Sequence, residues 1–380
     1  TYAHATGAGV TVGVIDSGVD FNHPDVSPNL DVDKSCSFIF DDTPTAHPSE
    51  VANGDCSNKA AVQDRNSHGT HVASTIAAPV NGFGIAGVAP EATIVGLKAC
   101  TEVGYCFADS VAAALRYAGD IQLDIVNLSL YADPYLYYCK NDASQREILA
   151  DLQSAARYAR QRGVLIVSAA GNQADDLQHP DTDSSSPDWP PGAAEFREIK
   201  NNCVVVPAEL PGVLTVSSTG PVGYPGYELD IADYSSVGMS RVDVAAPGGD
   251  YFRATGTAQD AVLGALSSTS DPDNGIWDFY DFIEQVVPAY DGLTVLTDGG
   301  YRYGFLNGTS MASPHVTGAV AVIRQANPNL DANTIKEILM TTAQDLPLSS
   351  PDGEENTFGH GLINLYQAVL FAEGYGNVEG

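Results

Sequence analysis

Basic residues are scarce in this sequence. Its 380 residues include 17 Lys and Arg against 48 Asp and Glu, which gives a formal net charge of −31. Nucleic acids and anionic membrane surfaces would repel such a chain, so neither is expected as a partner. There is also no run of about eighteen apolar residues, the length that a membrane-spanning helix requires. With 44% hydrophobic residues, the composition predicts a soluble globular protein with a large core.

Cysteine motifs for metals are absent as well. None of the six cysteines forms a CxxC pair, and the histidine spacing does not resemble a zinc site. An even number of cysteines in polar, turn-rich stretches favours disulfides in an exported protein, with buried free thiols of a cytosolic protein as the alternative. The first residues, TYAHATGAGV, have neither the basic start nor the apolar stretch of a signal peptide. If the protein is exported, we expect that its leader has been removed.

Short apolar runs alternate with helical patterns along the chain. The runs are rich in Val and Ile without strict alternation, which is typical of parallel strands covered on both faces. They span residues 9–16, 92–98, 123–130, 163–170 and 212–218. The helical patterns span residues 68–78, 107–118, 144–162, 310–326 and 333–342. This alternation predicts an α/β fold of three layers, doubly wound around a mostly parallel sheet.

Three long polar segments interrupt this pattern, at residues 31–64, 173–202 and 249–304. They are rich in Pro, Gly, Asp and Ser, and we interpret them as insertions on one domain that covers residues 1–380. The sequence contains no internal repeats.

Three short segments contain candidate catalytic side chains. Asp16 ends an apolar run, at the strand end where α/β folds place their sites. His68 and His71 stand at the start of a helix, and Ser310 stands at the start of another, near unpaired N–H groups. Taken singly, each has a plain structural explanation. Asp16 would cap a turn, the histidines would pack or form a metal pair, and Ser310 would be a helix cap. For His71 we favour the packing role.

Together these segments give the chain order Asp, His, Ser. The motifs resemble those of the subtilisin-like serine peptidases, or subtilases, which have this order. The matching motifs are DSGVD at Asp16, HGTHVA at His68, SAAGN ending at Asn172, and GTSMASPHV around Ser310. Further matches are GIAGVAP, DVAAPGG and GHGLINLYQA, so the resemblance covers nearly the whole chain outside the polar segments.

The resemblance implies a serine endopeptidase that forms an acyl-enzyme on Ser310. His68 would act as general base and then as general acid, and Asp16 would orient His68 and stabilise its imidazolium form. The Asn172 amide would bind the tetrahedral oxyanion. Thr309 and Ser313, the neighbouring hydroxyls, are expected to serve packing and the helix start.

Substrate is expected to add a strand between two edge segments, as the resemblance implies. The first covers Thr101–Cys106 and includes Gly104, and the second is Ser129-Leu130-Tyr131. The family usually has glycine at the position of Tyr131, so this ring is expected either to narrow the first specificity pocket or to swing aside. Val205 aligns with the floor of that pocket.

The resemblance also implies structural calcium, for which Asp25 and Asn81 match family ligands, with capping or turn roles as the alternative for each. No organic cofactor is expected. The expected partners are protein or peptide substrates, with a monomeric, secreted enzyme that matures by losing an N-terminal propeptide. Of the fifteen possible disulfide pairings we favour Cys36–Cys56, Cys100–Cys106 and Cys139–Cys203.

Two other functions compete with this one. A sedolisin-type acid peptidase shares the fold, but it would have glutamate in place of His68 and aspartate in place of Asn172. A catalytically inactive subtilase acting as a binding module is disfavoured because all four catalytic residues are present. It would be favoured again if a fluorophosphonate failed to label Ser310.

The acidic composition suits either an acid-tolerant protein or a halophilic one. Near pH 4 about half of the carboxylates remain ionised, roughly −24 against +25 from 17 Lys and Arg and 8 protonated His. The chain is then nearly neutral and escapes the self-repulsion that drives acid unfolding. Six cysteines and a large apolar fraction favour acid tolerance.

Overall fold

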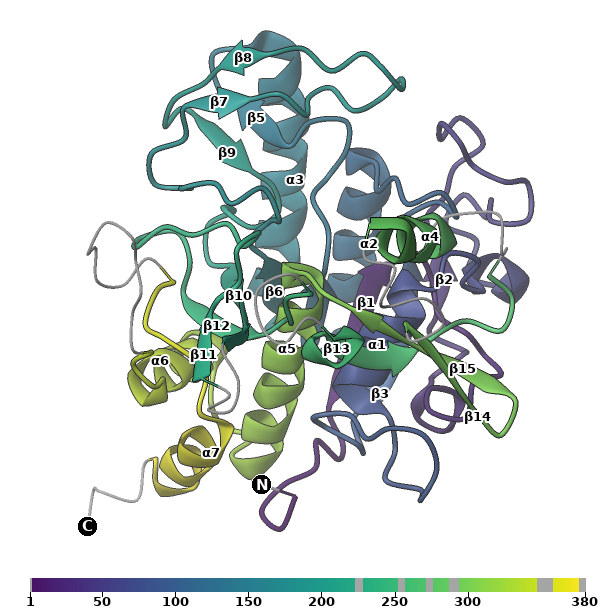
Figure 1. The fold of residues 1–380 in the computed structure, drawn as a ribbon, viewed down its shortest axis with the longest axis vertical. Coiled ribbons are helices and arrows are strands. Elements are labelled where there is room, and N and C mark those ends of the chain that lie inside the picture. The colour runs from purple at the N-terminus through teal and green to yellow at the C-terminus, as the bar shows by residue number, and fades with distance from the viewer. Residues whose placement is uncertain are drawn as a thin grey trace.

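The protein is built around an eight-stranded sheet (Figure 1). The structure, a computed structural model, describes residues 2–222, 228–251, 257–270, 276–286, 294–346 and 358–375. The strand order is β11-β10-β6-β4-β1-β3-β2, and β12 also pairs with β10. Every pairing is parallel except that of β10 with β11. The strands are β1 (Thr11–Asp16), β2 (Cys36–Ser37), β3 (Thr93–Lys98), β4 (Ile125–Leu128), β6 (Leu165–Ala169), β10 (Leu214–Val222), β11 (Glu228–Ile231) and β12 (Val244–Pro247).

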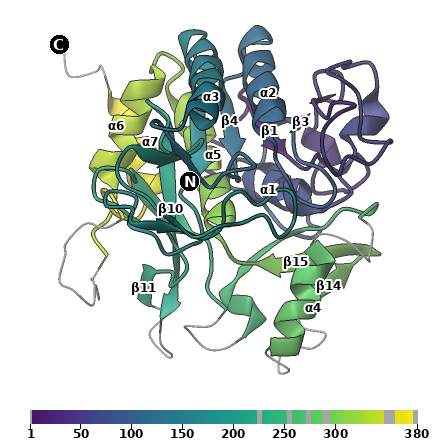
Figure 2. The same cartoon turned by 90° about the horizontal axis from the view of Figure 1, so that it is seen from above.

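Helices cover both faces of this sheet (Figure 2). The helices α2 (Ala108–Asp120) and α3 (Ala143–Gln161) share one apolar core, and α1 (His68–Ala77) and α5 (Thr309–Ala326) share another. Side chains of β1 alternate between the two: Val12 and Val14 enter the α1–α5 core, and Ile15 enters the α2–α3 core. The predicted three-layer α/β fold is confirmed.

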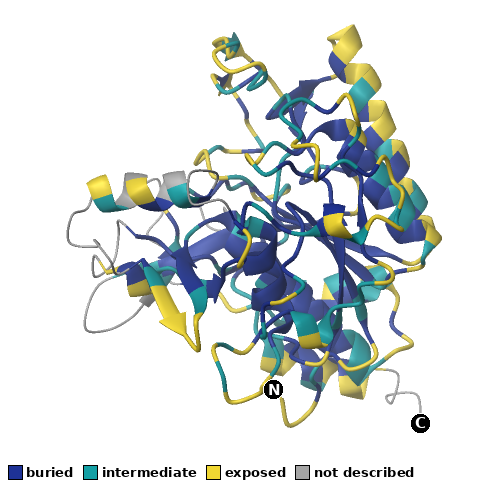
Figure 3. Cartoon of the chain, turned by 90° about the vertical axis from the view of Figure 1, so that its right-hand side faces the viewer, coloured by how far each residue is buried: buried dark blue, intermediate teal, exposed yellow. Residues whose placement is uncertain are grey.

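The expected strands and helices are present within a few residues of their predicted ends. The helix α6 (Ala332–Thr342) is among them, whereas α7 (Leu365–Gly374) and the strand β12 were not predicted. Figure 3 shows the central sheet almost wholly buried, with exposed residues gathered on the outer surfaces of the helices and on loops. None of the described helices is both long and apolar enough to span a bilayer.

The three polar segments differ in how they attach to the domain. The first contributes β2 and the short helix η2 (Lys59–Val62), and the second contains the hairpin of β7 (Thr182–Asp183) and β8 (Arg197–Glu198). The third forms an antiparallel sheet, β13-β15-β14, and the helix α4 (Ile276–Val286). Its strands are β13 (Val262–Ala265), β14 (Val295–Asp298) and β15 (Tyr301–Leu306). Within this segment, residues 252–256, 271–275 and 287–293 lie outside the described residues.

The third segment packs directly on the helix that begins with His68. The His71 Nε2 atom lies 3.1 Å from the carbonyl oxygens of Val262 and of Gly304. Gly264 in β13 lies under the imidazole ring of His71, where a Cβ atom would meet ring atoms at 2.5 Å. Burial lowers the pKa of His71 to about 3, so this histidine is neutral. The structural role expected for His71 agrees with this packing.

Three disulfides cross-link the described part of the chain, one of them within the first polar segment. The structure contains Cys36–Cys56, Cys100–Cys106 and Cys139–Cys203, which are the three pairs expected from the sequence. The third bridge lies between the antiparallel strands β5 (Tyr137–Cys139) and β9 (Cys203–Val205), where Cys139 and Cys203 are register partners.

Candidate active site

Three parallel strands and two helix starts converge on one edge of the sheet. Asp16 is the last residue of β1, Ser129 follows β4, and Asn172 lies three residues beyond β6. The helix α1 begins at His68. The helix α5 begins at Thr309, one residue before Ser310. Because the carboxyl ends of parallel strands lie at the same edge, residues far apart in sequence meet there.

Asp16 and His68 form a direct pair. The Nδ1 atom of His68 lies 2.8 Å from Oδ1 and 3.0 Å from Oδ2 of Asp16, whose side chain is 2% exposed. An ionised carboxylate only accepts hydrogen bonds, so Nδ1 carries the proton and Nε2 is left as the basic nitrogen. Close contact of α1 with the Asp16 turn requires Gly69, where a Cβ atom would lie 2.1 Å from the Gly18 carbonyl oxygen.

The charge around His68 favours its protonated form. Burial by itself would lower the pKa of His68, but the charge and hydrogen bond of Asp16, helped by the charge of Asp64, outweigh it and raise the pKa above its ordinary value. Neutral imidazole, the form needed in a base, therefore becomes abundant only at a higher pH than for a free histidine.

Ser310 and Asn172 meet at the start of α5. The Ser310 hydroxyl donates to the Ser129 carbonyl oxygen at 3.1 Å. The Asn172 Oδ1 atom accepts both the N–H (2.9 Å) and the hydroxyl (2.8 Å) of Thr309. Because these two bonds hold the Oδ1 side of the Asn172 amide against Thr309, its Nδ2 donor points away from Thr309. Thr309 thus orients Asn172, a role that the sequence pattern does not predict.

A second polar anchor fixes α5 on β4. Asn127, which is fully buried in β4, accepts the hydroxyls of Ser313 (2.6 Å) and Thr317 (2.8 Å) through Oδ1. Its Nδ2 donates to Ser129 Oγ at 2.9 Å, and Ser129 Oγ donates to the Ser310 carbonyl oxygen at 2.7 Å. The hydroxyls on either side of Ser310 therefore hold the helix and its neighbours, in keeping with the packing role expected for Ser313.

All predicted catalytic and substrate residues line a single cleft of about 350 Å³. Cys100, Cys106 and Thr309 also line it, which places the Cys100–Cys106 bridge in its wall. The predicted residues in the lining are Asp16, His68, Gly104, Ser129, Leu130, Tyr131, Asn172, Val205 and Ser310.

The ring of Tyr131 is held inside this cleft. It packs against the apolar cluster that contains Val205 and Ala170, and its hydroxyl donates to Asp188 Oδ2 at 2.9 Å. Asp188 comes from the second polar segment, and both it and Asp133 line the cleft. The ring therefore occupies part of the cleft beside Val205, and its effect on the specificity pocket stays a prediction.

Asp133 is a buried carboxyl beside this ring, with 4% of its surface exposed. It accepts the backbone N–H of Cys106. Burial, together with the hydrogen bond and charge of Asp188, raises the pKa of Asp133 well above its usual range. The sequence pattern contains no signal for this pair, because Asp188 lies in a polar segment far along the chain.

The two residues proposed for calcium differ in burial and in hydrogen bonding. Asp25 is fully buried, and its Oδ2 atom accepts the Ile85 N–H at 2.9 Å and the Tyr303 hydroxyl at 2.8 Å. Its Oδ1 atom has no hydrogen-bond partner among the described residues, so it suits a cation. Asn81, however, is exposed, and its Oδ1 atom accepts the Phe83 N–H. No group of three or more His, Cys, Asp or Glu suited to a metal occurs in the described part of the chain. Calcium at Asp25 stays a prediction.

The fold, the Asp16–His68 pair and Ser310 in the same cleft define a three-layer α/β protein with the constellation of a serine hydrolase. The chain belongs to the subtilase family, whose profile matches residues 7–361, and so to the subtilisin-like serine endopeptidases. It is 30% identical to fervidolysin from Fervidobacterium pennivorans over 374 residues, 97% of this chain but 42% of that protein.

Two further relatives match over most of their own length. Subtilisin Savinase from Lederbergia lenta is 29% identical over 364 residues, covering 96% of this chain and 92% of the relative. Among solved structures, a protease from Pseudoalteromonas arctica superposes with a TM-score of 0.65 at 27% identity, covering 98% of this chain and 92% of that one.

Proposed function

We propose that this chain is a secreted, acid-tolerant serine endopeptidase in which Ser310 is the nucleophile. The observation that carries the proposal is the Asp16–His68 pair, bonded at 2.8 Å and lining the same cleft as Ser310 and Asn172. The parent protein, incubated with an unfolded protein substrate, should produce internal fragments. Release of single terminal residues only, or no cleavage, would contradict an endopeptidase.

In the first chemical step, the Ser310 hydroxyl turns from the Ser129 carbonyl toward His68 Nε2. His68 takes the proton as Ser310 Oγ attacks the substrate carbonyl carbon. The negative charge that develops on the carbonyl oxygen is met by the Asn172 Nδ2 group and the N-terminal end of α5. His68 then passes the proton to the leaving amine, and Asp16 stabilises the imidazolium in between. Water then attacks the acyl-enzyme, with His68 again acting first as base and then as acid.

Tyr131 is expected to limit the size of the residue accepted at the cleavage site. Replacing Tyr131 with Gly empties the volume of the ring beside Val205, so peptides with a large aromatic residue there should gain about tenfold in kcat/KM relative to small ones, a typical value for pocket-filling contacts. Tyr131→Phe is the control, because it keeps the ring and loses only the hydrogen bond to Asp188. Equal preference ratios in Tyr131→Gly and the parent, measured on a peptide library, would show that the ring is not part of the pocket.

Acid tolerance is proposed from the near balance of charge at about pH 4. Incubation near pH 4, followed by assay at the optimum pH, should leave most of the activity in low salt and in molar salt alike. Loss in low salt with rescue by molar salt would favour a halophilic protein instead. Activity itself should fall in acid, because the raised pKa of His68 leaves the imidazole protonated there.

Buried groups set the sign of the stability change with pH. Burial raises the pKa of Glu209 to about 7. Burial raises the pKa of Asp133 by more than that of Glu209. A carboxyl with a raised folded-state pKa contributes stability below its unfolded pKa and loses it as pH rises through the folded value. Burial lowers the pKa of His23, His71 and His315. The stability that these groups contribute is present above about pH 6.5 and is lost as the pH falls, which is opposite to the effect of the carboxyls.

Above pH 7 the three histidines with a lowered pKa no longer change the stability, whereas the stability from His68, whose pKa is raised, is lost as the pH rises, in the same direction as that from Asp133. The thermal midpoint of an inactive Ser310→Ala background should fall between pH 7 and pH 9. Adding Asp133→Asn, which mimics the protonated carboxyl, should make that fall smaller, because only the contribution of His68 and other groups then remains. A midpoint that falls equally with and without Asp133→Asn would contradict the raised pKa of Asp133.

A further inference from the structure

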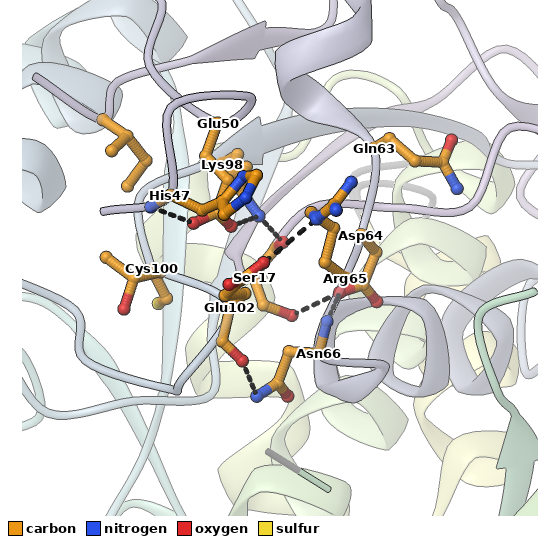
Figure 4. Close-up of polar contacts among 12 residues, drawn as sticks. Ser17, His47, Glu50, Gln63, Asp64, Arg65, Asn66, Lys98, Cys100 and Glu102 are labelled. Carbon is orange, nitrogen blue, oxygen red and sulfur yellow. Dashed lines mark hydrogen bonds and ion pairs between the residues drawn. The ribbon is translucent and has the colours of Figure 1, made fainter. Parts of the chain in front are cut away.

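The first polar segment reaches the back of the active site through Glu50. Glu50 and Lys98 are both fully buried, and Glu50 Oε1 lies 2.7 Å from Lys98 Nζ (Figure 4). Lys98 ends β3, directly opposite Asp16 in the register of β1 and β3. Its Nζ atom also donates to the carbonyl oxygen of Ser17. A buried ion pair is therefore bonded to the residue that follows Asp16.

The same turn is held from its other side by Asp64. The hydroxyl of Ser17 donates to Asp64 Oδ1 at 3.0 Å and accepts the N–H of Gly69, in the first turn of α1, at 2.9 Å. Asp64 is fully buried and also accepts the Thr70 N–H and hydroxyl, at 2.9 and 2.6 Å. Ser17 thus connects the Asp16 turn to the helix that carries His68, and Lys98 and Asp64 fix its two polar groups.

Stability by itself does not account for a buried ion pair at this position. Removing two charges from water is costly, and apolar residues of similar volume are often as stable. Glu50 is itself held in place, because its Oε2 accepts the His47 N–H at 3.2 Å and its carbonyl oxygen accepts the Ser37 hydroxyl at 2.8 Å. The pair is thus a rigid link from the Cys36–Cys56 segment to the Asp16 turn.

We propose that Glu50 and Lys98 are positioning residues, through which the first polar segment holds the Asp16–Ser17 turn in register with His68. The proposal rests on the proposed serine-peptidase function. Residues 31–64 thereby contribute to catalysis through Glu50, although Glu50 does not touch the reacting atoms.

The test is Glu50→Gln, which keeps the shape of the side chain and removes its charge. We expect the second-order rate constant for labelling of Ser310 by a fluorophosphonate to fall about ten- to a hundredfold, as for displaced catalytic groups, with KM for peptides nearly unchanged. The labelling reaction reports only folded molecules, so a loss of stability does not lower this rate constant.

The pH profile gives an independent readout. Asp16, Asp64 and neutral His71 are the titratable groups that act on His68. Loss of the Glu50 charge leaves Lys98 uncompensated, which disfavours the imidazolium form. The acidic limb of the labelling rate should therefore move to lower pH, by about half a unit. The control is Asp151→Asn, which breaks the exposed Arg116–Asp151 pair and should change neither rate nor profile.

The double variant Glu50→Gln/Lys98→Met carries the test if Glu50→Gln does not fold. It leaves no unpaired buried charge, so its thermal midpoint should lie closer to the parent. The Ser17 carbonyl loses its Lys98 donor, so labelling should be slow in this variant as well. A folded variant of either kind that is labelled within twofold of the parent rate would overturn the proposal. A parent that is not labelled at all would contradict the proposed function itself.

Discussion

Replacing Ser310 with Ala is expected to lower kcat for peptide hydrolysis by about a millionfold, and His68→Ala should cost about as much. That size is the one known for the same residues in subtilisin, which act as a unit. The reason is geometric: without His68 Nε2 there is no acceptor for the Ser310 proton, and without the Ser310 hydroxyl there is nothing to acylate. Asp16→Ala should cost less, about 10⁴, because a base remains but loses its orientation.

Each of these variants is to be purified free of host peptidases and compared with the double variant Ser310→Ala/His68→Ala. The double variant should be no worse than either single one, since the two side chains serve one reaction. If the costs of the single changes multiplied in the double variant, the residues would act independently and the assignment of a shared proton transfer would be wrong. Ser313→Ala is the matched control on the same helix and should lower kcat far less, because its hydroxyl bonds to Asn127 and Ser129 and not to the reacting atoms.

Asn172→Ala should lower kcat by about 10²–10³ and leave KM nearly unchanged. Losses of this size are known from the equivalent donor in subtilisin, and they reflect a hydrogen bond made mainly to the oxyanion of the transition state. Thr309→Val should reproduce part of the loss, because the Asn172 oxygen then keeps the Thr309 N–H but not its hydroxyl.

Steady-state kinetics on a short peptide separates these expectations. A rise in KM at constant kcat for Asn172→Ala would indicate a role in ground-state binding. Full activity of Thr309→Val would mean that the backbone N–H is sufficient to orient the amide.

The candidate catalytic residues could be identified in the sequence because each lies in a short local motif at the end of a strand or the start of a helix. Asp16 and His68 follow this pattern, as does Ser310. The residues that support them were not predictable in the same way. Thr309 contacts an amide 137 positions away, and Lys98 and Glu50 meet across 48 positions, so their roles depend on side-chain directions that a sequence pattern does not contain.

The polar segments were the least predictable part of the chain. Residues 249–304 looked like an insertion because they are rich in turn-forming residues, yet β13 and β15 form the surface against which His71 packs. Residues 173–202 supply Asp188 to the substrate cleft. Hydrophobic periodicity is weak in short antiparallel strands at the edge of a domain, so their contribution to the site became visible only in three dimensions.

The central claim is that Ser310 is a nucleophile activated by His68 in the folded protein. It is tested most directly by fluorophosphonate labelling of the native protein, of the unfolded protein and of the His68→Ala variant, each followed by peptide mapping. The account predicts one label, on Ser310, in the native protein only. A label on Thr309 or Ser313, equal labelling of the unfolded chain or of His68→Ala, or no label in native protein would contradict it.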